Sequence, residues 1–198
     1  MAAKVYPNAV VHRADEPVTV TGEGPLVLTV WKKSLLFNCY GFTVYDSTGN
    51  LVFRVDNYTA GTKAEIVLMD TSGRSLLTIR RKRLSLLDNW NVYEGESSVN
   101  PLFTVSKNVN LLNTKSLAHV TTPGSKTKKT IYEIEGSYTQ RCCFVYDDKR
   151  QCVAEIKRKE AVGGVRFGGD VFRLVVKSDE IDPSVAMALV VVLDQMFL

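Results

Sequence analysis

The C-terminal stretch DPSVAMALVVVLDQMFL, which begins at Asp182, constrains the fold more than any other part of this chain. Asp182 can accept hydrogen bonds from the first amides of a helix, and Pro183 suits the position directly after such a cap. No polar side chain occurs over residues 185–193, and a helix that is apolar on every side belongs inside a core or a membrane. Spanning a bilayer takes about 20 apolar residues, but Asp194 interrupts this run much sooner. The stretch therefore predicts a buried helix, over about residues 183–197, which the rest of the chain encloses.

A buried strand is the alternative for the same stretch, because Val190, Val191 and Val192 are β-branched. The Asp-Pro opening and the alanine, methionine and leucine residues that follow it favour the helix. We therefore expect a helix.

The middle of the chain repeats itself. Three segments align without a gap: DSTGNLVFRV from Asp46, DTSGRSLLTI from Asp70 and DDKRQCVAEI from Asp147. Each follows an apolar stretch and then alternates between apolar and polar residues, which is typical of a half-buried strand. The aspartate suits a tight turn, and Gly49 and its equivalent Gly73 supply a positive φ at little cost. The third copy has an arginine at residue 150, so its turn either differs or carries strain.

Further strand-like segments separate these repeats, and no helical pattern occurs before residue 183. Strands at this spacing indicate an antiparallel sheet or barrel. A closed antiparallel β-barrel can enclose one helix along its axis, and closure also removes exposed sheet edges. Residues 1–25 mix proline, glycine and charge without periodicity, so we expect a loose N-terminal arm followed by one barrel domain over residues 26–198.

Composition narrows the cellular setting. The net charge of +4 is mild, and aromatic residues do not interleave with the basic runs, so nucleic acid is an unfavoured partner. The opening MAAKVYPNAV lacks the apolar core of a signal peptide, and no segment is long enough to span a membrane. The four cysteines have no C-x-x-C spacing and only two histidines occur, so we expect reduced thiols, no metal site and an intracellular protein.

Several ordered blocks resemble the plant LURP-one-related family: VLTVWKKSLLFN, GFTVYDSTGNLVFRVDNY, IVLMDTSGRSLLTIRRKRLSLLDNW, YEIEGSYTQRC, AEIKRKE, GGDVFRLVV and VAMALVVVLDQM. The similarity extends from about Leu26 to the C-terminus. It implies a tubby-like fold, in which about twelve antiparallel strands close into a barrel around a C-terminal helix. It also implies kinship with phospholipid scramblases and with tubby proteins, which bind phosphoinositides, and an association with plant defence.

Catalytic chemistry has little support in the sequence. A nucleophilic enzyme needs a nucleophile, a base and an orienting group. His12 falls in the expected arm and His119 in a strand-like segment, where a surface or core histidine is the simpler interpretation. The glycine pairs at residues 163 and 168 do not form a dinucleotide-binding fingerprint. We expect no catalytic residues, no cofactor and no enzymatic activity.

Basic clusters are the remaining candidates for a functional site. Two of the repeats end alike, in I-R-R-K from Ile79 and I-K-R-K from Ile156, and a lysine-rich loop lies between them. A solvated barrel exterior explains these clusters most simply. The alternative is a patch that binds anionic lipid headgroups, where each cation contributes about 1 kcal/mol. Its candidate residues are Arg80, Lys82, Lys157, Lys159, Lys126, Lys128 and Lys129.

The sequence thus predicts a non-enzymatic regulatory or scaffolding module in the cytoplasm, with plant defence implied by the resemblance. Such a module could lie at the periphery of the plasma membrane through phosphoinositides, or enter the nucleus, and its protein partners are unknown. A scramblase-like membrane protein and an undetected enzyme are the alternative functions.

Overall fold

The structure is a computed structural model that describes residues 24–36, 40–57, 65–82, 88–108, 115–123, 129–160, 168–177 and 179–198. This part of the chain contains twelve strands and one helix. The strands, in chain order, are β1 (Leu26–Trp31), β2 (Tyr40–Tyr45), β3 (Leu51–Asn57), β4 (Glu65–Met69), β5 (Ser75–Arg81), β6 (Asn89–Glu94), β7 (Phe103–Lys107), β8 (Ser116–Thr121), β9 (Thr130–Ser137), β10 (Cys142–Tyr146), β11 (Cys152–Arg158) and β12 (Val171–Val176). The helix, α1, spans Pro183–Phe197. The arm predicted over residues 1–25 lies almost entirely outside the described residues.

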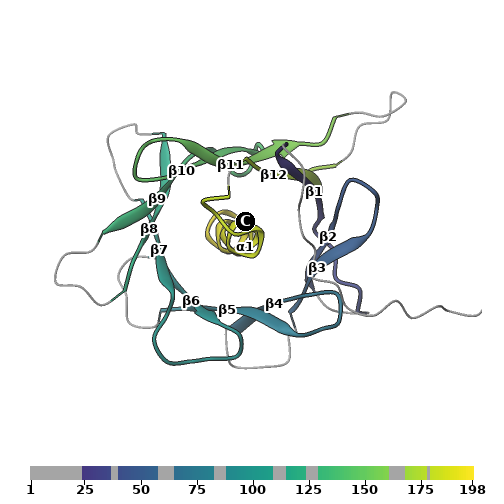
Figure 1. The fold of residues 1–198 in the computed structure, drawn as a ribbon, viewed down its shortest axis with the longest axis horizontal. Helices are drawn as coiled ribbons and strands as arrows, with labels where there is room; N and C mark the ends of the chain where they lie inside the picture. The colour runs from purple at the N-terminus through teal and green to yellow at the C-terminus, as the bar shows by residue number, and fades with distance from the viewer. Residues whose placement is uncertain are drawn as a thin grey trace, which may run out of the picture.

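The strands form a closed barrel in which each strand pairs antiparallel with its neighbours in the sequence. β1 pairs with β12 from Leu26 opposite Val176 to Trp31 opposite Val171, and this pairing closes the ring (Figure 1). The closed antiparallel barrel around a C-terminal helix, predicted from the alternation and from the resemblance, is confirmed.

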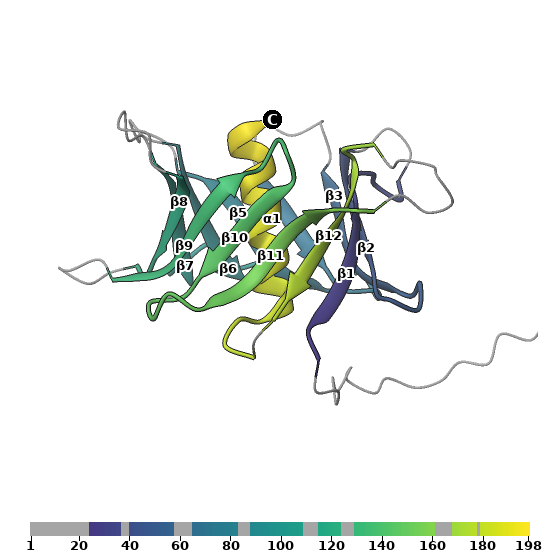
Figure 2. The same ribbon diagram turned by 90° about the horizontal axis from the view of Figure 1, so that it is seen from above.

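Helix α1 passes through the middle of the barrel (Figures 1 and 2). Asp182 caps its first turn, since the carboxylate accepts a hydrogen bond from the Ser184 amide at 2.7 Å. Adjacent residues Leu189 and Val190 are both buried, as is every residue from Ala186 to Asp194. The wall surrounds the helix with inward-facing side chains of alternate strand positions, which explains why an amphipathic stripe is absent. The helix prediction is confirmed, and the buried-strand alternative was wrong.

The three sequence repeats form three equivalent hairpins, β2–β3, β4–β5 and β10–β11. In each turn one carboxylate oxygen of the leading aspartate accepts hydrogen bonds from the backbone amides two and four residues later. Each pairing also shifts register one residue before that aspartate. The repeats therefore share backbone geometry as well as sequence.

Arg150 occupies the position where the other two hairpins have glycine. Its amide bonds to the Asp147 carbonyl at 3.1 Å, as Gly49 and Gly73 do with their aspartates, and its φ is +64°. The turn is thus the same and carries the strain that a non-glycine residue meets in this conformation. The guanidinium contacts the carboxylates of Glu133 and Glu135 at 2.8 and 2.9 Å, which offsets part of this strain.

Cys142 and Cys143 illustrate the alternation of the wall. Cys142 is exposed and Cys143 is fully buried, as expected for neighbours in a strand. Both, and Cys152, are free thiols.

Candidate functional site

The two basic strand ends singled out in the sequence lie on β5 and β11. These strands are six positions apart in the ring of twelve, counted in either direction. They therefore stand on opposite sides of the barrel, with α1 between them (Figure 1). Arg80 and Lys82 do not form one wall patch with Lys157 and Lys159, so the single-patch version of the prediction was wrong. The sequence repeat equates the two hairpins but contains no information about how many strands separate them in the ring.

The loop lysines do not join the two strand ends either. Lys126 and Lys128 lie outside the described residues. Lys129 precedes β9, where its amine contacts the Asp148 carboxylate at 3.0 Å and holds the pKa of that carboxyl below its usual value. Because β9 begins at the opposite end of the barrel from the ends of β5 and β11, Lys129 is separated from both.

The two basic clusters do share one end of the barrel. In an antiparallel ring the odd-numbered strands all run in the same direction, which is also the direction of α1. Two contacts identify the shared end: the Lys107 amine donates to the Met196 carbonyl at 2.7 Å, and Lys32 pairs with Asp194 at 3.0 Å. We call this the basic end. It carries the described basic residues Lys32, Lys33, Arg80, Arg81, Lys82, Lys107, Lys115, Lys157, Arg158 and Lys159.

Acidic residues at the basic end neutralise part of this charge. Arg80 pairs with Glu65 at 2.8 Å and Arg81 with Asp88 at 3.0 Å. Lys33, Lys82 and Arg158 are exposed, and no described carboxylate forms an ion pair with them. Lys33 follows β1, Lys82 follows β5 and Arg158 ends β11, so cations without an ion-pair partner occur at three places around this end of the barrel.

The opposite end of the barrel, where α1 begins, has the opposite charge. The three repeated turns each place an aspartate there, and the β6–β7 connection and the approach to α1 add further carboxylates. We call this the acidic end. Its described acidic residues are Asp46, Asp70, Glu94, Glu96, Asp147, Asp148, Asp179, Glu180 and Asp182. Basic residues are fewer there, namely Arg74, Lys129, Lys149, Arg150 and Lys177. The barrel is therefore electrically polar along its axis.

Large apolar side chains are exposed beside the cations of the basic end. Trp31, at the end of β1, is 41% exposed, and Tyr40, at the start of β2, is 73% exposed. Leu35, in the connection between these strands, is 52% exposed. The Lys33 amine lies 5.2 Å from the centre of the Trp31 ring. Aromatic rings combined with lysines are typical of proteins that contact the interfacial region of a bilayer.

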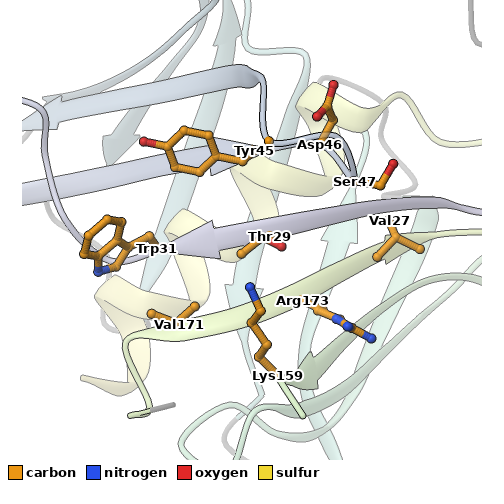
Figure 3. A pocket seen from close by; sticks show the side chains of 10 residues that line it. Val27, Thr29, Trp31, Tyr45, Asp46, Ser47, Lys159, Val171 and Arg173 are labelled. Carbon is orange, nitrogen blue, oxygen red and sulfur yellow. The ribbon is translucent and has the colours of Figure 1, made fainter. Parts of the chain in front are cut away.

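A hollow of about 640 Å³ lies on the outer wall across β12, β1 and β2 (Figure 3). Val27, Thr29 and Trp31 of β1 line it because alternate residues of this strand face outward. Its other lining residues are Tyr45, Asp46, Ser47, Gly49, Lys159, Val171 and Arg173. The surface is mainly apolar, and cations come from β12 and from the residue following β11. Of the predicted lipid-binding residues that the structure describes, Lys159 alone lines this hollow.

Charged side chains also occur inside the barrel, below the basic end. The Asp194 carboxylate, on α1, pairs with Lys32 and accepts a hydrogen bond from the Tyr138 hydroxyl at 3.2 Å. Burial and the neighbouring Asp194 charge raise the pKa of Tyr138. The guanidinium of Arg141 lies 4.3 Å from the Tyr138 ring and 4.2 Å from the Phe172 ring, and it donates to the Gly169 carbonyl. This arrangement anchors the last turns of α1 to the wall.

The sequence reasoning missed this internal anchor. The one available signal was the aspartate that interrupts the apolar run at residue 194. A buried carboxylate needs a partner, but the partners are remote in sequence, so the interruption could not identify them.

A metal site, a histidine-based catalytic site and a membrane-spanning helix each require a particular arrangement of residues. They contain no group of three histidine, cysteine or acidic side chains arranged to hold a metal ion. His119 lies on β8 opposite Ser106 and Glu133 of the neighbouring strands, and His12 lies outside the described part. No helix in that part has the length and apolar character needed to cross a bilayer.

Comparison with known proteins adds the family. A profile of the LURP-one-related family matches residues 26–194, which includes every described strand and most of α1. The chain belongs to the LURP-one-related family. This confirms the resemblance drawn from the sequence blocks.

Relatives in Arabidopsis thaliana match this LURP-one-related chain over most of its length. Protein LURP-one-related 8 is 60% identical over 176 residues, which cover 87% of each chain. Protein LURP-one-related 17 is 49% identical over 184 residues, covering 86% of this chain and 82% of the relative. The crystal structure of another Arabidopsis thaliana protein is similar, with a TM-score of 0.67 and 27% identity, over 88% of this chain and 92% of that one.

Proposed function

We propose that this LURP-one-related protein is a non-enzymatic regulatory or scaffolding module that attaches reversibly, through its basic end, to membrane surfaces rich in anionic phospholipid headgroups, including phosphoinositides. The observation that carries the proposal is the separation of charge along the barrel axis, with the exposed Trp31, Leu35 and Tyr40 beside the cations.

End-on attachment makes use of both basic clusters although they lie on opposite sides. A barrel of twelve strands is roughly 20 Å or more across, from the usual strand spacing and tilt. The Debye length at physiological ionic strength is about 8 Å, so the two clusters add little to each other's field in solution. A flat membrane can touch both at once, and each cation close to it contributes about 1 kcal/mol. Several cations together would hold the protein at the surface without a lipid anchor.

The acidic end supports the orientation. Its carboxylates are repelled by an anionic surface, so the molecule attaches with that end directed into the solvent. The acidic end would then be available to protein partners, as a scaffolding role requires. A role in plant defence, and a position in the cytoplasm, at the plasma membrane or in the nucleus, are further parts of this proposal that rest on the family resemblance.

Vesicle sedimentation of the full chain tests the proposal. The test variant is Lys82→Glu combined with Arg158→Glu, because both side chains are exposed on opposite sides of the basic end. The matched control, Lys129→Glu with Lys149→Glu, makes the same charge change at the acidic end, where both lysines are more than half exposed. The vesicles are phosphatidylcholine alone, or phosphatidylcholine with phosphatidylserine and a phosphatidylinositol bisphosphate.

We expect the wild type and the control variant to sediment with anionic vesicles at low salt, and to be released as the salt concentration rises. The basic-end variant should bind about tenfold more weakly or worse, because two reversed charges remove more than 1.4 kcal/mol of binding free energy. Equal losses in both variants, or a wild type that ignores anionic vesicles at low salt, would contradict the proposal. Circular dichroism spectra confirm that each variant remains folded.

A further inference from the structure

The hollow on the outer wall faces sideways over β12, β1 and β2, although it shares Trp31 and Lys159 with the basic end. Its floor is the outer surface of paired strands, where Trp31 lies opposite Val171 and Thr29 opposite Arg173. Tyr45 lies opposite Thr29 on the other side and forms a second aromatic wall. The hollow is therefore built on rigid, hydrogen-bonded backbone.

Its size and surface suit a small amphiphilic molecule. A volume of about 640 Å³ falls within the range of roughly 300–1,000 Å³ that is usual for ligand pockets. Val27 and Val171 provide aliphatic contacts, and the Trp31 ring, 41% exposed, can cover an apolar body from the side. These groups bind the apolar part of a ligand.

Two cations give the hollow its preference for charge. Figure 3 shows the Lys159 amine pointing toward Thr29, between β1 and β12, while the Arg173 guanidinium extends away from it on the same side of the hollow. Arg173 forms no ion pair with a described carboxylate, whereas Arg54 and Arg80 on other strands do. An outward arginine without such a partner, at the side of an apolar hollow, is suited to binding an anion.

Asp46 determines which way round an anionic ligand lies. Its carboxylate, at the turn side of the hollow, accepts hydrogen bonds from Thr48 and Asn50. These bonds lower the pKa of Asp46 to about 2, so the group is charged at neutral pH. An anionic group is therefore repelled from the turn and directed toward Arg173 and Lys159.

An extended peptide fits this surface less well. Peptides that bind to sheets usually add a strand to an exposed edge, because their backbone groups need hydrogen-bond partners. The closed barrel offers no free edge here, since β12, β1 and β2 are paired in sequence around the ring. A ligand with few polar groups beyond one anionic head needs no backbone hydrogen-bond partners, so the paired strands of this floor do not disfavour it.

We propose that the hollow lined by Val27, Trp31, Val171, Lys159 and Arg173 is a binding site for a single anionic amphiphile, a molecule with an apolar chain or ring and one phosphate or carboxylate. The apolar part lies on the valines and against Trp31, and the anionic head meets Arg173 and Lys159. Such a ligand is either a free acid or a lipid taken from a bilayer. The site shares Trp31 and Lys159 with the basic end, but Lys82 and Arg158, the two residues reversed in the vesicle test, do not line it.

Tryptophan fluorescence of the full chain provides a direct measurement. The chain has two tryptophans, and Trp90 is buried inside the barrel, so an amphiphile in the hollow changes the emission of Trp31. The probes are decyl phosphate and decyltrimethylammonium, which share a chain and differ in the sign of the head, both below their micelle concentrations. The site variant is Arg173→Glu. The control, Lys149→Glu, makes the same reversal of charge at the acidic end, away from the hollow. Calorimetry of Trp31→Phe measures binding without the fluorescent signal.

We expect decyl phosphate to shift the emission saturably, and decyltrimethylammonium to have a much weaker effect. Arg173→Glu should weaken decyl phosphate binding about tenfold or more, while Lys149→Glu leaves it unchanged. Equal binding of the two probes, or full affinity in a folded Arg173→Glu variant, would overturn the site.

The vesicle variant Lys82→Glu/Arg158→Glu separates the two proposals, because Lys82 and Arg158 do not line the hollow. If that variant loses vesicle binding but retains decyl phosphate, both proposals stand. If the wild type ignores vesicles but binds decyl phosphate through Arg173, the hollow stands alone and its ligand is a free acid. If Arg173→Glu also weakens binding to vesicles that contain phosphatidic acid, a bilayer lipid is the source.

Discussion

The two ends of the barrel differ in how far apart in the sequence their contacting residues lie. At the acidic end, the contacts that fix the turns and the helix cap are local: Asp46 bonds to Thr48 and Asn50, and Asp182 bonds to Ser184. At the basic end, they join remote segments, as Lys32 with Asp194 and Lys107 with Met196. Short-range hydrogen bonds stabilise individual turns, whereas long-range ones hold the helix inside the wall. We therefore expect changes at the basic end to affect the whole domain, and changes at the acidic end to remain small.

The largest expected effect comes from Asp194→Ala at the basic end. The Asp194 carboxylate is 5% exposed, and its loss leaves Lys32 and the Tyr138 hydroxyl without their partner inside the wall. Removing one member of a buried pair costs about 3–5 kcal/mol. Because the Lys32 side chain is 32% exposed, water can hydrate its amine once Asp194 is removed. We therefore expect the free energy of unfolding, measured with urea, to fall by about 2–4 kcal/mol. A cost below that of the acidic-end changes described next would remove the contrast between the ends. The pair Lys32→Met and Asp194→Leu, made together, should recover part of the loss.

The hairpin turns at the acidic end provide the next test. Gly73 has a φ of +89°, and an added Cβ would meet no atom within 4 Å, so Gly73→Ala isolates the backbone cost. We expect about 1–2 kcal/mol. Arg150→Gly should differ by less, because relief of the same strain is offset by the lost contacts to Glu133 and Glu135, each worth about 0–1 kcal/mol. Thermal unfolding compares the two, and an Arg150→Gly variant destabilised more than Gly73→Ala would show that the ion pairs outweigh the strain.

Removing the helix cap tests the acidic end of α1 itself. Asp182→Ala removes the carboxylate that accepts from the Ser184 amide. The expected cost is about 1 kcal/mol, the usual value for such a cap. Asp182→Asn, which can still accept the hydrogen bond, is the matched control and should lose only a fraction of that. If the cap costs as much as Asp194→Ala, then both ends of the helix matter equally.

The smallest effects, opposite in sign at the two ends, concern pH. Hydrogen bonds lower the pKa of Asp46 to about 2, below the value near 4 of an unfolded chain. The ionised Asp46 therefore contributes fully to folding stability above about pH 4, and this contribution is lost as pH falls toward 2. Burial raises the pKa of Tyr138 above 10, so its contribution is complete below about pH 10 and is lost as pH rises. Tyr138→Phe should therefore lose less stability than the wild type above pH 10. An identical alkaline profile would contradict this, and an NMR titration of the Asp46 carboxyl checks the acidic side.

Much of the architecture could be predicted because it depends on near neighbours in the chain. Alternation in the segments that follow Asp46, Asp70 and Asp147 identified the strands, and the apolar run before Asp194 identified the helix. The need to enclose that helix then indicated a closed barrel. The hollow was not predicted, because its lining comes from β1, β2, β12 and the segment after β11, whose adjacency depends on how the ring closes.

The basic clusters mark the limit of the sequence reasoning. By itself the sequence determined that two hairpins end in cations and that three turns begin with aspartate, since these are properties of short segments. Only the tertiary structure decided where those segments lie: Arg80 and Lys157 on opposite sides of the ring, but at one end of it. The physical reason is that local patterns determine the strands and the chemistry of their turns. The number of strands in the ring and the β1–β12 pairing determine which strands face each other across the barrel. The same closure brings Lys32 to Asp194, a partner that no local pattern could have named.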